Sequence, residues 1–144
     1  VYDKAIFASL SVLERNWTDI HNLNPKSICQ DESKVTINNI RKPSDGLINW
    51  KKSAEECYNL IRAVTHPYPG AYTFWNKKKL FVWKSKISNL KETISGETII
   101  DKNKIIISTT KGCIEILSLQ IENEPICTPH VFLKSYNLPS GIIF

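Results

Sequence analysis

The sequence predicts an α+β fold: a small, open antiparallel β-barrel or meander with helices packed at its ends, and one further helix at the N-terminus. Three patterns predict it. Apolar residues recur at helical spacing in residues 3–17, and a second helical pattern with a capping signature covers residues 53–64. From Gly70 onward, aromatic and β-branched residues form short runs separated by turns, as is typical of strands. A chain of 144 residues is long enough to bury the core of one such domain.

The first helix has one apolar stripe, spaced four, three and four residues apart: Ile6, Leu10, Leu13 and Trp17. Asp3 is placed to cap its N-terminus. An isolated helix of this length is marginal in water, and the polar residues 18–34 that follow form a connector without an apolar partner for the stripe. The chain has no methionine and begins in what reads as the middle of a helix, so we expect a fragment of a longer polypeptide.

The middle of the chain holds a short element, a turn and the second helix. Residues 35–40, VTINNI, are expected to form a short strand, and residues 41–46, RKPSDG, a turn. Ser53 and Glu56 have the spacing of a capping box. One helical face then carries Cys57, Leu60, Ile61 and Val64, and the helix is expected to stop before Pro67 and Pro69.

Two hairpins dominate the C-terminal half. The runs 71–75 and 79–87 flank the turn NKK, and the runs 104–109 and 113–121 flank the turn TKG. Residues 95–99 fit a turn that enters another short strand. A last helix is predicted from Thr128, with Pro129 at its first position, to about Tyr136.

Charge and cysteine usage restrict the function classes. The net charge of +5 and the pI of about 9.0 favour an anionic partner such as a nucleotide or a nucleic acid. No apolar run approaches the roughly 18–20 residues that cross a bilayer, so no membrane partner is expected. The four cysteines form no C-x-x-C pair and have no histidine at metal-ligand spacing, so we interpret them as reduced, mostly buried thiols of a cytoplasmic protein without a metal site.

No motif of a hydrolase, a zinc peptidase or a phosphate-binding loop is present, and no catalytic residue is predicted. A basic hairpin carries the stronger signal for binding. In it, aromatic residues at positions 74, 75, 81 and 83 are surrounded by five lysines, Lys77, Lys78, Lys79, Lys84 and Lys86. Lysines interleaved with aromatic side chains on a small barrel are typical of single-stranded nucleic-acid binding. The alternative is a buried aromatic side and a solvated lysine side, with Phe81, Trp83 and Ile87 on one face.

Residues 45–85 closely resemble the C-terminal domain of the formyltransferases that use 10-formyltetrahydrofolate. In that family a D-G-x-I-x-W element precedes a helix that ends in I-R-A. An H-P-Y-P-G-A-Y-T-like stretch and a K-L-x-V-W-K strand follow. The corresponding elements here are Asp45 to Trp50, Ile61 to Ala63, His66 to Thr73, and Lys79 to Lys84. Residues 112–120 resemble the family's closing hairpin, and residues 1–24 resemble the last helix of its catalytic domain.

The resemblance implies an open, OB-like barrel after one helix, with three parts. Residues 1–24 would be the terminal helix of a Rossmann-like catalytic domain and the start of the connector, 25–44 the interdomain linker, and 45–144 the OB-like domain. The family's catalytic Asn, His and Asp and its folate loop match no position here. This chain is therefore expected to bind no cofactor itself, whereas the intact enzyme would use 10-formyltetrahydrofolate and the missing catalytic domain would cover the first helix.

Two acceptors are compatible with the family: an amino sugar on a nucleotide, or methionyl-tRNA. The stretches QDESKVT and IRKPSDGLINW are more similar to the sugar branch, although Ile37 stands where a tyrosine is usual. The chemistry of the side chains favours four residues beside a phosphate-bearing acceptor, namely Arg41, Lys42, Arg62 and His66. Arg62 and His66 have a second interpretation as groups that stabilise the C-terminus of their helix. A free-standing RNA-binding module and a structural or dimerising appendage remain alternatives.

Overall fold

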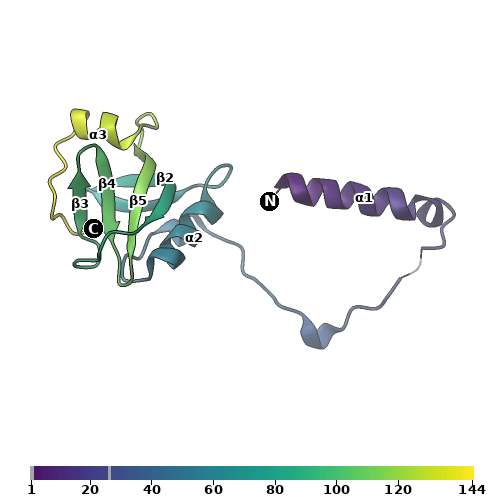
Figure 1. Ribbon diagram of the computed structural model, residues 1–144. Coiled ribbons are helices and arrows are strands. Elements are labelled where there is room, and N and C mark those ends of the chain that lie inside the picture. The colour runs from purple at the N-terminus through teal and green to yellow at the C-terminus, as the bar shows by residue number, and fades with distance from the viewer. Residues whose placement is uncertain (1, 26) are drawn as a thin grey trace. The chain divides into compact units, whose positions relative to one another are not determined.

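The computed structural model describes residues 2–25 and 27–144 (Figure 1). The chain forms two compact units, one that extends to Asn39 and one that comprises Ile40–Phe144. Among the described residues, no helix combines the length and the apolar character that a bilayer crossing requires.

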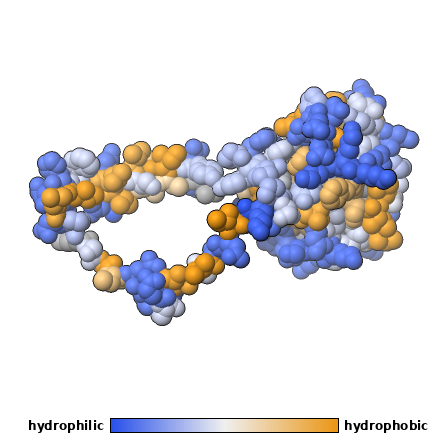
Figure 2. Space-filling model, turned by 180° about the vertical axis from the view of Figure 1, so that it is seen from behind, coloured by the Kyte–Doolittle hydropathy of each residue, from blue (hydrophilic) through white to orange (hydrophobic). Residues whose placement is uncertain are grey.

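The first unit consists of helix α1, Tyr2–His21, and an irregular segment. The predicted helix is present but longer than residues 3–17, because residues 18–21, expected in the connector, continue it. Asp3 lies within the first turn and is therefore not the capping residue. Its negative charge there interacts favourably with the helix dipole. No residue of α1 is buried, and its apolar side chains form a row on its surface (Figure 2).

The prediction of a strand at residues 35–40 was wrong. These residues form no strand, and Ile37 and Ile40 are 87% and 91% exposed. A segment with strand-like residues forms a strand only where a partner strand pairs with its backbone, and residues 35–40 pair with no strand among the described residues. The one regular turn nearby is the 3-10 turn η1, Glu32–Lys34, at whose start the Asp31 carboxylate accepts a hydrogen bond from the Ser33 amide at 3.1 Å.

In the second unit, the 3-10 turn η2, Pro43–Gly46, leads to helix α2, Ala54–Val64. The predicted capping box is confirmed: the Glu56 amide donates to Ser53 Oγ at 3.3 Å, and the Ser53 amide donates to Glu56 Oε2 at 3.1 Å. The predicted apolar face points inward, with Cys57, Ile61 and Val64 buried. Helix α2 therefore forms because its local signals and its buried face agree.

Five antiparallel strands follow, with the order β1-β2-β5-β4-β3 in the sheet (Figure 1). Their bounds are β1 Ala71–Trp75, β2 Lys78–Ser88, β3 Thr98–Asp101, β4 Lys104–Ser108 and β5 Cys113–Ile121. Helix α3, Pro129–Ser135, packs against β5 and β4, and α2 packs mainly against β2. The predicted α+β class with an open antiparallel barrel is thus confirmed.

The core lies between α2 and the inner face of the curled sheet. Its central side chains come from α2, β2, β4 and β5, and they include Ile61, Val82, Ile107 and Ile114. Both sheet edges are covered by irregular segments of the same chain. Leu47 pairs with Tyr72 of β1, and on the other edge the Thr98 amide of β3 donates to the Ile142 carbonyl at 2.7 Å. Each edge strand is therefore partly paired with a segment of its own chain.

Irregular register in β2 changes which side chains share a face. The pairing with β5 shifts between Val82 and Lys84 and again between Lys84 and Ser85. The prediction that Phe81, Trp83 and Ile87 share one face is therefore wrong for Ile87, which pairs with the core residue Ile114. An extra residue in one strand reverses the alternation beyond it, and sequence spacing does not reveal the bulge.

Candidate functional site

A groove of about 220 Å³ lies beside η2, between the chain entering the second unit and the turn that follows α2. Arg41 and Lys42 contribute one wall, and Tyr68 and Pro69 contribute the other. Both cations are exposed. Of the four residues predicted to lie beside a phosphate-bearing acceptor, Arg41 and Lys42 therefore lie together in this groove.

The groove depends on two glycines that allow its walls to approach each other. A Cβ atom on Gly46 would lie 2.4 Å from the carbonyl oxygen of Gly70. Gly70 itself has a φ of +92°, and a Cβ there would lie 2.8 Å from Cη2 of the Trp83 ring. On the other wall, the Lys42 amide donates to Asp45 Oδ2 at 2.7 Å, which fixes the start of the turn. The Asp45-Gly46 and Pro69-Gly70 pairs therefore have a structural role, which is to shape the groove.

Arg62 and His66 do not line this groove. The Arg62 Nε–H donates to Asn59 Oδ1 at 2.8 Å, and its guanidinium lies 6.0 Å from the centre of the Tyr58 ring. The exposed His66 ring stacks on Trp83, with centroids 4.0 Å apart and planes inclined by 9°. Both residues lie within two positions of Val64, a groove residue at the end of α2.

The five lysines of the basic hairpin do not form one surface. Lys77 occupies the hairpin turn with a φ of +63°, and Lys78 pairs with Trp75 on the core side of the strand. Lys79 lies 4.7 Å above the Tyr72 ring on the outer side. The register shifts place Lys84 and Lys86 on that outer side too, where Lys86 Nζ lies 3.2 Å from Glu115 Oε2. One of the five lysines is therefore already engaged by a carboxylate.

The aromatic side chains of this hairpin divide between core and surface. Rings on the outer face contact one another in a row from His66 through Trp83, Phe81 and Tyr72 to Phe74. Trp83 and Tyr72 are buried, whereas Phe74 is 52% exposed. The interpretation of the aromatics as largely buried holds for the middle of the row and is wrong for Phe74.

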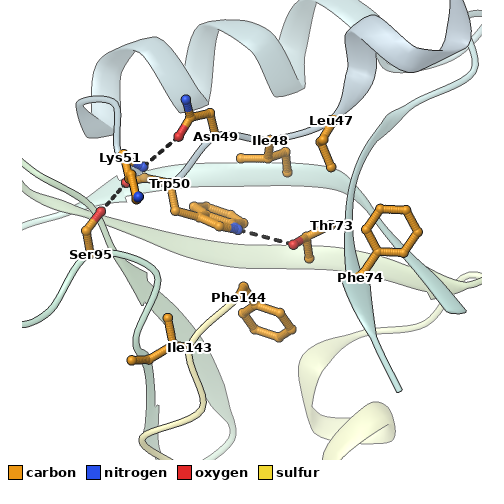
Figure 3. A pocket seen from close by; sticks show the side chains of 10 residues that line it. All are labelled: Leu47, Ile48, Asn49, Trp50, Lys51, Thr73, Phe74, Ser95, Ile143 and Phe144. Atoms are coloured by element: carbon orange, nitrogen blue, oxygen red, sulfur yellow. Dashed lines mark hydrogen bonds between the residues drawn. The ribbon is translucent and has the colours of Figure 1, made fainter. Parts of the chain in front are cut away.

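Sequence reasoning missed a second cavity, about 420 Å³ in volume. Figure 3 shows the Trp50 ring across its middle, the Phe144 ring beneath it and Phe74 at one end. The Trp50 Nε1–H donates to Thr73 Oγ1 at 3.3 Å, and Ser95 Oγ donates to the Trp50 carbonyl. No local sequence pattern predicts this cavity, because it forms only where the C-terminal residues, which include Ile143 and Phe144, pack beside β3.

The cysteines are all free, and two of them, Cys57 and Cys113, are buried. Burial raises the pKa of the Cys57 thiol to about 11, and it also raises the pKa of Cys113. A thiol in this state is a poor nucleophile at neutral pH. Within residues 2–25 and 27–144, no group of His, Cys, Asp or Glu side chains is arranged to hold a metal ion.

Comparison with protein families gives one match over most of the second unit. Residues 41–137 match the family described as "Formyl transferase, C-terminal domain". The chain is also 41% identical, over 121 residues and 83% of its length, to the bifunctional polymyxin resistance protein ArnA of Wigglesworthia glossinidia brevipalpis. It spans only 18% of the length of that relative.

Two solved structures have a similar fold at low sequence identity. HypX from Aquifex aeolicus in complex with tetrahydrofolic acid is 14% identical, with a TM-score of 0.57 over 90% of this chain and 22% of its own. WlaRD, a sugar 3N-formyl transferase solved in the presence of dTDP and 5-N-formyl-THF, is 24% identical. Its TM-score is 0.50 over 86% of this chain and 43% of its own.

Proposed function

Because the chain belongs to the formyl transferase C-terminal domain family, which matches residues 41–137, we propose that it positions the acceptor in a formyltransferase. It is the non-catalytic part of that enzyme. The catalytic domain of the same enzyme holds 10-formyltetrahydrofolate, a role that the tetrahydrofolic acid complex of HypX supports. That cofactor would supply the formyl group for transfer to the acceptor amine, and the proton lost by the amine would be balanced by protonation of the folate nitrogen that leaves.

The observation that carries this proposal is the groove beside η2, where Arg41 and Lys42 face Tyr68 and Pro69. Two cations beside an aromatic ring and a proline suit an anionic ligand with an apolar body. A guanidinium offers paired donors to a phosphate, and a lysine adds a point charge. Arg62 and His66, at the adjacent end of α2, are proposed to contact the acceptor from outside the groove.

We assign the acceptor as a nucleotide-linked amino sugar. The similarity of QDESKVT and RKPSDG to the sugar branch supports this choice. Its phosphates would meet Arg41 and Lys42, and its amino group would extend toward the catalytic domain. We further propose that the enzyme is cytoplasmic, and that the apolar row of α1, Ile6, Leu10, Leu13 and Trp17, packs against the catalytic domain. Each of these four side chains is 49–61% exposed in this unit.

The test is a titration of the isotopically labelled 144-residue chain with UMP, a UDP-amino sugar and tRNA at two salt concentrations, followed by amide chemical shifts. We expect the UDP-amino sugar to shift the amides of Arg41, Lys42 and Tyr68. The double variant Arg41→Gln/Lys42→Gln should abolish these shifts. Lys134→Gln, an exposed lysine on α3, is the matched control and should preserve them.

Two results would overturn the assignment. Salt-sensitive shifts of Lys77–Lys86 with tRNA alone would place the chain in the tRNA branch, since phosphate contacts weaken steeply with salt. Absence of any shift near Arg41 with all three ligands would remove the groove as an acceptor site in this chain.

A further inference from the structure

The cavity around Trp50 is separate from the groove beside η2, and the two share no lining residue. Residues in the range 40–46 line the groove, and residues 47–51, which follow directly, line the cavity. The cavity volume of about 420 Å³ falls within the range of about 300–1,000 Å³ that is usual for small-molecule sites. It therefore has room for a ligand of its own.

The walls favour a flat ring. Trp50, Phe74 and Phe144 present aromatic side chains from three separate parts of the chain, and Leu47 and Ile143 add apolar surface (Figure 3). Phe74 and Ile143 are 52% and 60% exposed, so apolar surface is left uncovered at the mouth. Aromatic walls of this kind bind planar rings by offset or edge-to-face contacts.

The polar groups favour a negative charge on that ring. The Trp50 indole N–H is occupied by Thr73, and the Ser95 hydroxyl hydrogen by the Trp50 carbonyl. Asn49 Oδ1 already accepts from the Lys51 amide at 3.0 Å. The Lys51 ammonium, in contrast, forms no ion pair within the described residues, and it is the cation among the residues that line the cavity. An ammonium group without a carboxylate partner favours a ligand that carries a negative charge.

We propose that this cavity is a second binding site, for a planar aromatic ring that carries an anionic group. The ring lies among Trp50, Phe74 and Phe144, and the anion meets the Lys51 ammonium. Nucleoside monophosphates and aryl carboxylates both have this chemistry. Two of the residues that line it, Ile143 and Phe144, lie beyond residues 41–137, which match the family.

The test uses the full 144-residue chain, labelled with nitrogen-15 and titrated with UMP, p-aminobenzoate and uridine. We expect UMP or p-aminobenzoate to shift the Trp50 indole N–H and the amides of Asn49 and Phe74. Uridine, which has the ring but no charge, should bind about fivefold more weakly than UMP, as one solvent-exposed charge interaction allows. A response to UMP alone identifies a nucleotide site, and a response to p-aminobenzoate alone identifies an aryl carboxylate site.

Three variants make the test specific. Lys51→Gln should remove the advantage of UMP over uridine, and Phe74→Ala should weaken both ligands without disturbing the core, because Phe74 is half exposed. Lys134→Gln should change neither. The proposal is overturned if no ligand shifts Trp50, or if Lys51→Gln binds UMP as the parent does. Shifts at Arg41 and Tyr68 without shifts at Trp50 would support the acceptor groove and exclude this second site.

Discussion

At the scale of single residues, the family motifs of this chain are mainly structural. Asp45 fixes the η2 turn, Gly46 lets that turn meet the carbonyl of Gly70, and the Trp50 indole donates to Thr73. Gly70 also clears space for the Trp83 ring. These residues join η2, the turn after α2 and β1 into one assembly. A motif can therefore be specific for a family and still contain no reacting group.

The close approach at Gly46 gives the first prediction. In Gly46→Ala the new Cβ would lie 2.4 Å from the Gly70 carbonyl oxygen, so one wall of the groove must move. We expect a loss of about 2 kcal/mol or more in the free energy of unfolding, measured by urea denaturation. The comparison variant is Gly141→Ala, where φ is +87° but the nearest atom is 4.0 Å away. An equal or smaller loss in Gly46→Ala would contradict the steric explanation.

The second prediction concerns the hydrogen bond between Trp50 and Thr73. Thr73→Val keeps the shape of the side chain and leaves the buried indole N–H without an acceptor. The expected loss is about 1–3 kcal/mol in the free energy of unfolding. Thr73→Ser retains the hydroxyl and should recover most of the stability. If the valine and serine variants unfold at the same urea concentration, the hydrogen bond does not contribute.

At the scale of elements, agreement between local signals and burial decided which predictions succeeded. The α2 prediction succeeded because the Ser53 capping signal and the buried face specify the same helix. The residues 35–40 had the composition of a strand but no partner, and they stayed irregular. In β2 the alternation was correct up to Val82 and failed beyond the bulges. Alternation depends on an unbroken ladder, which involves the partner strand as well.

The capping box of α2 predicts a pH dependence. The Ser53 amide and hydroxyl donate to Glu56 and lower its pKa below the ordinary value of 4.5. A carboxyl group with a lowered pKa in the folded state stabilises the protein above about pH 4.5, and this contribution is lost as the pH falls through the lowered value.

The difference in unfolding free energy between the parent and Glu56→Gln should therefore be largest near pH 7 and shrink below pH 4.5. Urea denaturation at several pH values measures it. Glu55→Gln removes the same charge from the same turn and leaves the capping box intact, so its effect should be smaller. Identical pH profiles for the two variants would show that the capping hydrogen bonds are not the cause.

At the scale of the whole molecule, stability resides in one of the two units. The core cluster contains residues of the second unit only, and α1 buries none of its side chains. Helix propensity alone gives an isolated helix of this length little stability in water, because most helical stability comes from tertiary packing. We therefore expect the first unit to gain most of its order from a partner, which we propose to be the catalytic domain.

This arrangement predicts that residues 40–144 fold independently. A chain that begins at Ile40 should keep the urea midpoint and the amide spectrum of the second unit. In the full chain, the amides of residues 2–21 should exchange with solvent at rates within about tenfold of an unstructured peptide. Strong protection of α1, or a lower midpoint for the shorter chain, would show that the units stabilise each other.

The sequence by itself determined the helices, the hairpins, the family and the two cations of the groove. Capping residues, turn residues and apolar periodicity act between neighbours in the chain, so they can be read without a structure. Only the tertiary structure decided that Arg41 and Lys42 share a groove with Tyr68 while Arg62 turns to Asn59. It also decided that Phe144 reaches the cavity beside Trp50. Such contacts join residues far apart in the chain, and their geometry depends on how the sheet curls and where its register shifts.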